Sequence, residues 1–180
     1  TLVCTTSLGI TTIATACFSG LDSFPLLAVP FFILAGNLMK FGGLSNKILE
    51  FADALVGHIK GSLGMVAVVA SMFFAALSGS SPATVSAIGS LTIPKMEEEG
   101  YDRAYATALN AAAGTIGVII PPSIPFVIYG VVANCSIADM FKAGILPGVL
   151  IGVVLMIVNY IAVTKNGYGM KNQANKHFSF

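Results

Sequence analysis

The residues with the clearest chemical potential lie at two breaks inside long apolar stretches. The first break is Ser78-Gly79-Ser80-Ser81-Pro82, and the second runs from Gly114 and Gly117 to Pro121-Pro122-Ser123. A double proline removes two amide donors, so a helix cannot continue through it. Each break therefore leaves carbonyl groups at the end of one half-helix and amide groups at the start of the next. Such carbonyls suit a cation and such amides suit an anion.

The first break combines hydroxyl groups with the start of a helix. Ser81 is a natural N-cap and Pro82 a natural first helical residue, which predicts a half-helix whose amides face the gap. At the second break Gly117 permits close backbone approach, and Ser123 can cap the helix that resumes. Neither break contains a carboxylate or a histidine. Neutral oxygens can hold Na⁺, whereas a proton-coupled carrier needs a titratable group in its path. Sodium is therefore the favoured coupling ion.

The composition shows where these breaks lie. The chain has 180 residues, of which 56% are hydrophobic and 9% charged, with a net charge of +1. Runs of 34, 35 and 22 residues between Lys60 and Lys95, Arg103 and Asp139, and Lys142 and Lys165 contain no charge. Runs of this length predict membrane-spanning helices. We therefore expect an all-α integral membrane protein in the lipid bilayer, and no nucleic-acid partner because no basic cluster is present. No organic cofactor and no metal other than Na⁺ is expected.

The pattern of apolar and charged residues predicts the following organisation. Residues 1–60 form scaffold helices, with a crossing helix over 23–39 and an amphipathic arm helix over 40–60 on the membrane surface. Residues 61–138 form a transport unit, made of a hairpin over 61–94 and a broken helix over 104–138. A continuous helix of 61–94 would be about 50 Å long, beyond a hydrocarbon core of about 30 Å. Residues 139–164 form a scaffold helix, with its helical part from about 143, and 165–180 a disordered polar tail.

Positive charge decides how the hairpin is threaded. If 61–94 enters and returns on the same side, that side carries eight Lys and Arg residues and the other side only Lys142. A single crossing would leave almost no bias. The positive-inside rule therefore predicts a re-entrant hairpin that opens toward the cytoplasm.

Four segments resemble a known family. Phe24–Met39 (FPLLAVPFFILAGNLM), Gly79–Met96 (GSSPATVSAIGSLTIPKM), Ala111–Gly130 (AAAGTIGVIIPPSIPFVIYG) and Ala143–Leu150 (AGILPGVL) look like the large membrane subunit of tripartite ATP-independent periplasmic (TRAP) transporters. The resemblance covers roughly residues 18–164 and implies the first of two inverted repeats of an elevator-type carrier. It also implies Na⁺ coupling, a small membrane subunit, a periplasmic substrate-binding protein, and organic-acid substrates such as C4-dicarboxylates or sialic acid. The expected location is the bacterial inner membrane.

The resemblance also assigns site residues. The expected sodium-binding residues, at the hairpin tip and the unwound helix, are Ser78, Gly79, Ser80, Ser81, Gly114, Gly117, Ile120 and Pro122. The substrate-side candidates are Ser81, Pro82, Ala83, Pro121 and Ser123.

Three other functions are considered. Another sodium-coupled anion carrier, or a channel with a re-entrant pore loop, would use similar breaks. Ala76-Leu77-Ser78-Gly79 nearly matches the Gly-x-Ser-Gly pattern of intramembrane serine proteases. A nucleophilic serine needs a base within hydrogen-bond reach, and no histidine lies in any of the charge-free runs. We therefore expect that the chain is not an enzyme.

Overall fold

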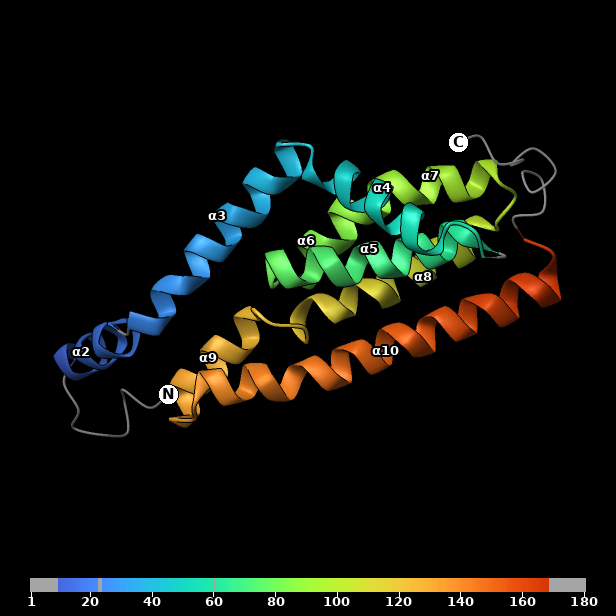
Figure 1. Cartoon of the computed structure of the whole chain (residues 1–180). Coiled ribbons are helices and arrows are strands. Elements are labelled where there is room, and N and C mark those ends of the chain that lie inside the picture. Colours follow the sequence, from blue (N-terminus) through green and yellow to red (C-terminus); the bar gives the residue numbers. More distant parts are fainter. Residues whose placement is uncertain (1–9, 23, 60, 169–180) are drawn as a thin grey trace.

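The computed structural model describes residues 10–22, 24–59 and 61–168. This part of the chain is helical and has no strand, which confirms the predicted all-α fold (Figure 1). Most of the predicted tail, residues 169–180, lies outside the described residues. The elements are α2 (Ile10–Leu21), η1 (Phe24–Leu27), α3 (Ala28–Phe41), α4 (Leu44–Val56), α5 (Ser62–Ser78), α6 (Ser81–Thr84), η2 (Val85–Gly89), α7 (Ser90–Glu98), α8 (Arg103–Gly114), η3 (Thr115–Val118), α9 (Ile124–Ala133) and α10 (Ile137–Asn166).

Helices α5 to α7 form a helical hairpin. Helix α5 ends at Ser78 and is capped by Gly79, whose φ of +61° is a conformation that glycine adopts without strain. The chain then returns through α6, the π-helical turn η2 and α7, which pack back against α5 (Figure 1). The return arm continues to Glu98, past the expected end at residue 94. The re-entrant placement of this hairpin in a membrane stays a prediction.

The second break interrupts a helix, as its glycines and prolines predict. Helix α8 ends at Gly114, a short 3₁₀ turn (η3) follows, and α9 begins only at Ile124. Asp102 caps the start of α8, because its carboxylate accepts a hydrogen bond of 3.2 Å from the amide of Tyr105. The interruption over residues 119–123 contains a cis peptide bond between Pro121 and Pro122.

Helix α10 runs along the hairpin and the broken helix (Figure 1). It begins at Ile137, six residues before the expected start near residue 143, because Ser136 caps it and accepts a hydrogen bond from the amide of Asp139. Within the described residues it is the one helix long and apolar enough to cross a membrane, and a second span exists if α3 and α4, bent by 74°, are taken together. Its buried residues include Gly144, Gly148 and Gly152, so other side chains pack directly on its backbone.

Helices α3 and α4 occupy the region of the predicted crossing helix and arm helix. Helix α4 is amphipathic: Ile48, Leu49 and Ala52 are buried against the hairpin, whereas Lys47 and Glu50 form an exposed ion pair of 2.7 Å. The arm helix is shorter than the predicted 40–60, because Gly43 has a left-handed φ and Val56 ends the helix before Gly57.

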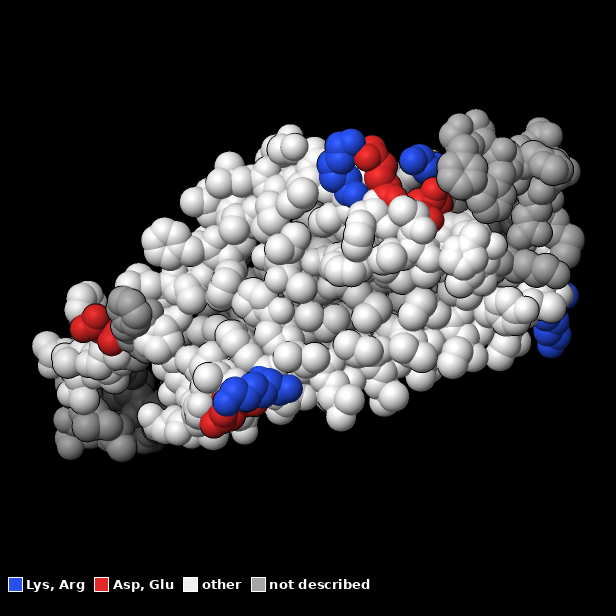
Figure 2. Space-filling model, viewed as in Figure 1, with Lys and Arg blue, Asp and Glu red and all other residues white. Residues whose placement is uncertain are grey.

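Most of the face of the molecule that Figure 2 shows is uncharged. Figure 2 shows Lys, Arg, Asp and Glu in a few small clusters separated by wide areas without charge. Large side chains on α3 and α10 are exposed, for example Phe41 and Leu146 at 85% and 77%. An exposed apolar area of this extent marks an interaction with a membrane or a partner.

The open end of the hairpin is held by polar and aromatic contacts. Asn159 of α10 is fully buried; its amide donates to the carbonyl of Gly61 over 3.2 Å, and its side-chain oxygen accepts from the hydroxyl of Tyr105 over 3.1 Å. Tyr105, Tyr101 and Tyr168 stack on one another, with ring centroids 5.4 to 6.3 Å apart. These contacts join α10, α5 and the start of α8.

Candidate functional site

The two breaks meet in space. The carbonyl of Gly79, at the hairpin tip, accepts a hydrogen bond of 3.2 Å from the amide of Ile124, the first residue of α9. A Cβ atom placed on Gly79 would lie 2.5 Å from the carbonyl oxygen of Pro122. A Cβ atom placed on Gly117 would lie 2.9 Å from the carbonyl oxygen of Ser80. The hairpin tip and the unwound segment therefore contact each other closely, at Gly79 on one side and at Gly117 on the other.

A buried set of hydroxyl groups closes the hairpin tip. The Oγ of Ser78 lies 3.1 Å from the Oγ1 of Thr84, and both side chains are almost fully buried. Thr84 Oγ1 donates to the carbonyl of Ser80 over 2.9 Å, and the amide of Thr84 donates to the same carbonyl over 3.1 Å. The tip is therefore rich in neutral oxygen atoms that are held in place by one another.

Thr84 was not among the predicted site residues. Its hydroxyl lies 2.7 Å from the position of a Cβ atom on Gly117, so it faces the unwound segment as well as the tip. The signal in the sequence is its position four residues after Ser80, where a helical threonine can bond back to a carbonyl.

The start of the return arm differs from the expectation by one residue. The N-cap is Ser80, which has extended backbone angles of φ −137° and ψ 123°, and not Ser81. Ser81 is the first helical residue and Pro82 the second, because the carbonyl of Ser80 accepts the first helical hydrogen bond, from Thr84. The side chain of Ser80 makes no capping hydrogen bond.

Ser123 caps α9, as predicted. It is fully buried; its hydroxyl accepts from the amide of Phe126 over 3.4 Å and donates to the carbonyl of Val118 over 2.7 Å. The hydroxyl thus bonds a carbonyl before the interruption, that of Val118, and an amide after it, that of Phe126. The prolines between them supply no amide, so the carbonyls of this segment have fewer donors nearby.

The remaining predicted residues are less central. Gly114 lies against the side chain of Val85 in the return arm, and Ile120 lies against Gly148 of α10. Ser81, Ala83 and Pro121 are half-buried, and Pro82 is exposed, at the edge of the contact. The structure therefore brings together Ser78, Gly79, Ser80, Gly117, Pro122 and Thr84, with the other predicted residues around them.

The chemistry of the contact is that of neutral oxygens. Within the described residues no group of three His, Cys, Asp or Glu residues could hold a metal ion. The carbonyls of Ser80 and Pro122 and the hydroxyl of Thr84 lie within 2.5 to 2.9 Å of the positions that Cβ atoms on Gly79 and Gly117 would take. A cradle of this kind, which a Cβ atom would fill, fits a small monovalent cation bound without a charged ligand.

Comparison with known proteins gives the family. The description "Tripartite ATP-independent periplasmic transporter, DctM component" matches residues 1–178. The isethionate TRAP transporter permease protein DctMQ of Oleidesulfovibrio alaskensis is 51% identical over 168 residues, which are 93% of this chain and 26% of the relative. The sialic acid TRAP transporter large permease protein SiaM of Vibrio cholerae is 44% identical over 99% of this chain and 42% of the relative. The C4-dicarboxylate TRAP transporter large permease protein DctM of Pseudomonas aeruginosa is 48% identical over 80% and 34%.

These relatives are permeases and not enzymes, which agrees with the missing catalytic base. The chain spans between 26% and 42% of the length of these three relatives. The predicted resemblance is confirmed: the chain belongs to the family of the DctM component of the tripartite ATP-independent periplasmic transporters.

Proposed function

We propose that the chain is part of the large permease subunit of a sodium-coupled importer of organic acids in the bacterial inner membrane. Its partners are a small membrane subunit and a periplasmic binding protein that delivers the substrate. The family and the relatives named for isethionate, sialic acid and C4-dicarboxylates support an organic anion as cargo. The wide uncharged surface supports a place in the bilayer.

The observation that carries the proposal is the contact between the two breaks. Sodium binds among the carbonyls of Ser80 and Pro122 and the hydroxyls of Ser78 and Thr84. All four oxygens are neutral, and the side chains of Ser78 and Thr84 are buried, so these atoms can replace the hydration shell of a monovalent cation without a titratable group. The ion then neutralises the ends of the half-helices and favours a carboxylate on the adjacent first-turn amides.

The same contact couples ion binding to movement. Ordering both breaks around one ion makes the hairpin and the broken helix a single unit, which moves in the manner of an elevator. Helix α4 joins this unit to α3, and Gly42 and Gly43 form the connection between the two helices. Positive coupling must be reciprocal, so substrate should raise the sodium affinity as much as sodium raises the substrate affinity.

Transport by the complete permease, reconstituted with its small subunit and binding protein, tests the ion. Uptake should require an inward Na⁺ gradient, and Gly117→Ala should abolish its sodium dependence, because the new Cβ would lie 2.7 Å from Thr84 Oγ1. Gly36→Ala is the matched control, since its Cβ would meet the Cβ of Ser78 at an ordinary 3.5 Å. Ser81→Ala should have a small effect. Uptake that follows a proton gradient and ignores sodium would contradict the proposal.

Cysteine labelling of the same permease tests the re-entrant hairpin. The background variant lacks all three cysteines of this chain, Cys4, Cys17 and Cys135, and any cysteine in the rest of the permease. Single cysteines at Lys47 and Glu98 should react from the cytoplasmic side only, and one at Asp22 from the periplasmic side. Reaction of the first two positions from opposite sides would show that 61–98 crosses the membrane once.

A further inference from the structure

A hollow with charged and apolar walls lies beside α4, away from the contact of the two breaks. Its volume is about 400 Å³, within the range of about 300–1,000 Å³ typical of small-molecule sites. Helix α4 contributes Glu50 and Asp53, and α7 contributes Lys95. The apolar part of the wall is formed by Leu49, Leu63 and Val66 of α4 and α5. One hollow thus offers negative charge, positive charge and apolar surface.

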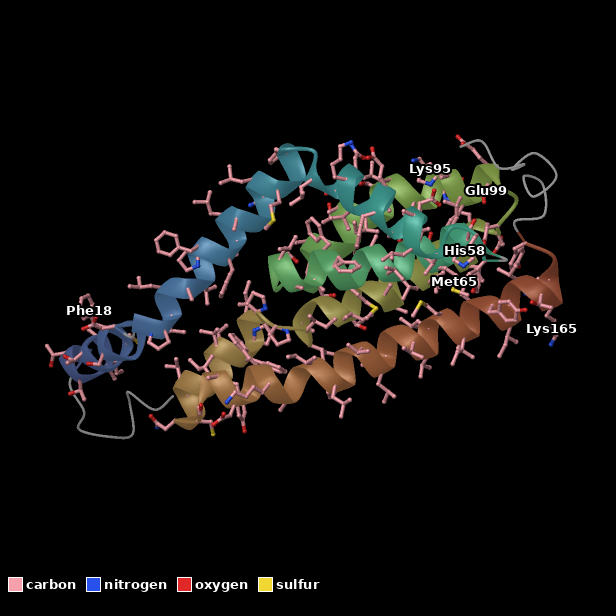
Figure 3. All side chains as sticks on the ribbon, viewed as in Figure 1. Phe18, His58, Met65, Lys95, Glu99 and Lys165 are labelled. Carbon is pink, nitrogen blue, oxygen red and sulfur yellow. The ribbon has the colours of Figure 1, made fainter. Side chains whose placement is uncertain are left out.

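The carboxylates and the ammonium group that line this hollow in the described part of the chain form no ion pair with one another. Among the described residues, neither Asp53 nor Lys95 belongs to an ion pair, whereas Glu50 is paired with Lys47. The carboxylate of Asp53 lies against Gly57 at the end of α4. A Cβ atom on residue 57 would collide with it, so a glycine is needed there for the carboxylate to take this position. Figure 3 shows Lys95 on α7, at the same end of the molecule as His58, which follows α4. An unpaired carboxylate and an unpaired ammonium therefore line one space from two different helices.

The surroundings of the hollow are suited to an amphiphile. A second hollow of about 280 Å³, where α4 meets α5, is lined mainly by apolar side chains, including Phe51, Phe73 and Leu77. Phe51, Leu44 and Leu55 of α4 are also exposed. A ligand with one ammonium group, one anionic group and an apolar body can satisfy the charges of the first hollow and cover the apolar surface of α4.

We propose that this hollow binds the headgroup of an aminophospholipid. The primary ammonium group lies against Asp53 and Glu50, the phosphate against Lys95, and the acyl chains along the exposed apolar residues of α4. The inference rests on the proposed function insofar as that function places the chain in a membrane. Because α4 joins α3 to the hairpin, a lipid in this hollow would hold the arm helix against α5 and α7.

Native mass spectrometry of the complete permease tests the lipid. The protein is presented with phosphatidylethanolamine, phosphatidylcholine and phosphatidylglycerol of identical chains, and the retained lipid is quantified. Phosphatidylethanolamine should be retained most, because the choline group has no N–H donors and the glycerol group no charge. Asp53→Asn should lower its retention about fivefold, which corresponds to about 1 kcal/mol for an exposed ion pair. Lys95→Gln should lower the retention of all three lipids by a similar factor.

Matched controls remove the same charges elsewhere. Asp139→Asn and Lys142→Gln break an exposed ion pair at the start of α10, whose side chains are 71% and 78% accessible, and should leave lipid retention unchanged. Equal retention of the three lipids by the unsubstituted protein, or no effect of Asp53→Asn and Lys95→Gln, would overturn the proposal. Displacement of the lipid by an equal concentration of soluble phosphoethanolamine would also overturn it in favour of a soluble zwitterion. Selection of phosphatidylethanolamine without sodium-dependent uptake would contradict only the proposed sodium coupling. Sodium-dependent uptake without selection among the lipids would contradict only the proposed lipid site.

Discussion

Substitution of Asn159 tests how α10 is fixed to the open end of the hairpin. This asparagine is fully buried and makes two hydrogen bonds to other elements, one to the carbonyl of Gly61 and one with the hydroxyl of Tyr105. Gly64 has no side chain in the way, so the amide group packs directly on the backbone of α5. Asn159→Ala would leave a buried carbonyl and a part-buried hydroxyl without these partners.

The expected loss of stability follows from these two bonds. Side-chain hydrogen bonds within membrane proteins contribute about 0.6 kcal/mol on average, and net values in water reach about 1.5 kcal/mol. Two bonds therefore predict a decrease of about 1–3 kcal/mol in the free energy of unfolding for Asn159→Ala. Tyr105→Phe removes one bond and keeps the ring stacked, so it should cost about half as much.

Reversible unfolding of the complete permease in mixed detergent micelles measures these values. A double-mutant cycle with Asn159→Ala and Tyr105→Phe should give a coupling energy of about 0.5–1.5 kcal/mol. Asn166→Ala, at the exposed end of the same helix, is the control and should change little. Strict additivity of the two substitutions, with a loss below about 0.5 kcal/mol for Asn159→Ala, would refute the argument that these bonds hold α10 in place.

Two further predictions concern the hairpin and the turn before α8. Burial raises the pKa of Tyr101 to about 12 from an ordinary value of 10.0, so the protonated form is favoured in the folded state. The stability that Tyr101 contributes should be fully present below pH 10 and should be lost progressively between pH 10 and pH 12; Tyr101→Phe should remove this part of the pH dependence in an unfolding titration. Gly79→Ala should lower the melting temperature of the permease, because φ is +61° there and the new Cβ would lie 2.5 Å from a carbonyl oxygen. Gly89→Ala, with a nearest contact of 3.4 Å, should change the melting temperature far less, and equal effects would contradict this account.

The two breaks could be predicted because their causes are local. Gly79 ends α5 through its positive φ, and the double proline at 121–122 removes amide donors whatever surrounds it. Ser123 caps α9 because a serine oxygen reaches the amide three residues ahead. Such features depend on a few neighbouring residues, so the sequence alone is sufficient to place them.

The details that depend on contacts across the fold could not be predicted in the same way. Ser80 and Ser81 are equally suitable N-caps by residue type, and the choice between them follows from the hydrogen bonds of Thr84. Thr84 owes its place in the site to Gly117, which lies more than thirty residues away in the sequence. The hydrogen-bond partners of Asn159 are Gly61, directly before α5, and Tyr105 of α8. Both lie more than fifty residues away in the sequence, so no spacing pattern predicts these bonds.

The start of α10 could not be predicted accurately from the charge pattern of the sequence. The sequence predicts that the helix begins near residue 143, but α10 begins at Ile137, and Asp139 and Lys142 pair with each other over 3.0 Å within its first turns. Pro147 lies inside α10 and does not end it. The division of the chain into a transport unit over 61–138 and a scaffold helix over 139–164 stays a prediction, to be tested by the movements of the complete carrier.

The hydrogen bond between Gly79 and Ile124 has a consequence for the order of folding. The first amides of a helix have no partner within the helix, and here one of them is satisfied by the hairpin tip. The acceptor precedes the donor in the chain, so it leaves the ribosome first. We therefore expect the hairpin to close before α9 is stably formed, with the finished tip acting as a template for the start of that helix. Truncation of a nascent chain between residues 100 and 123 should leave a closed hairpin, whereas loss of the tip should leave α9 frayed at its first turn.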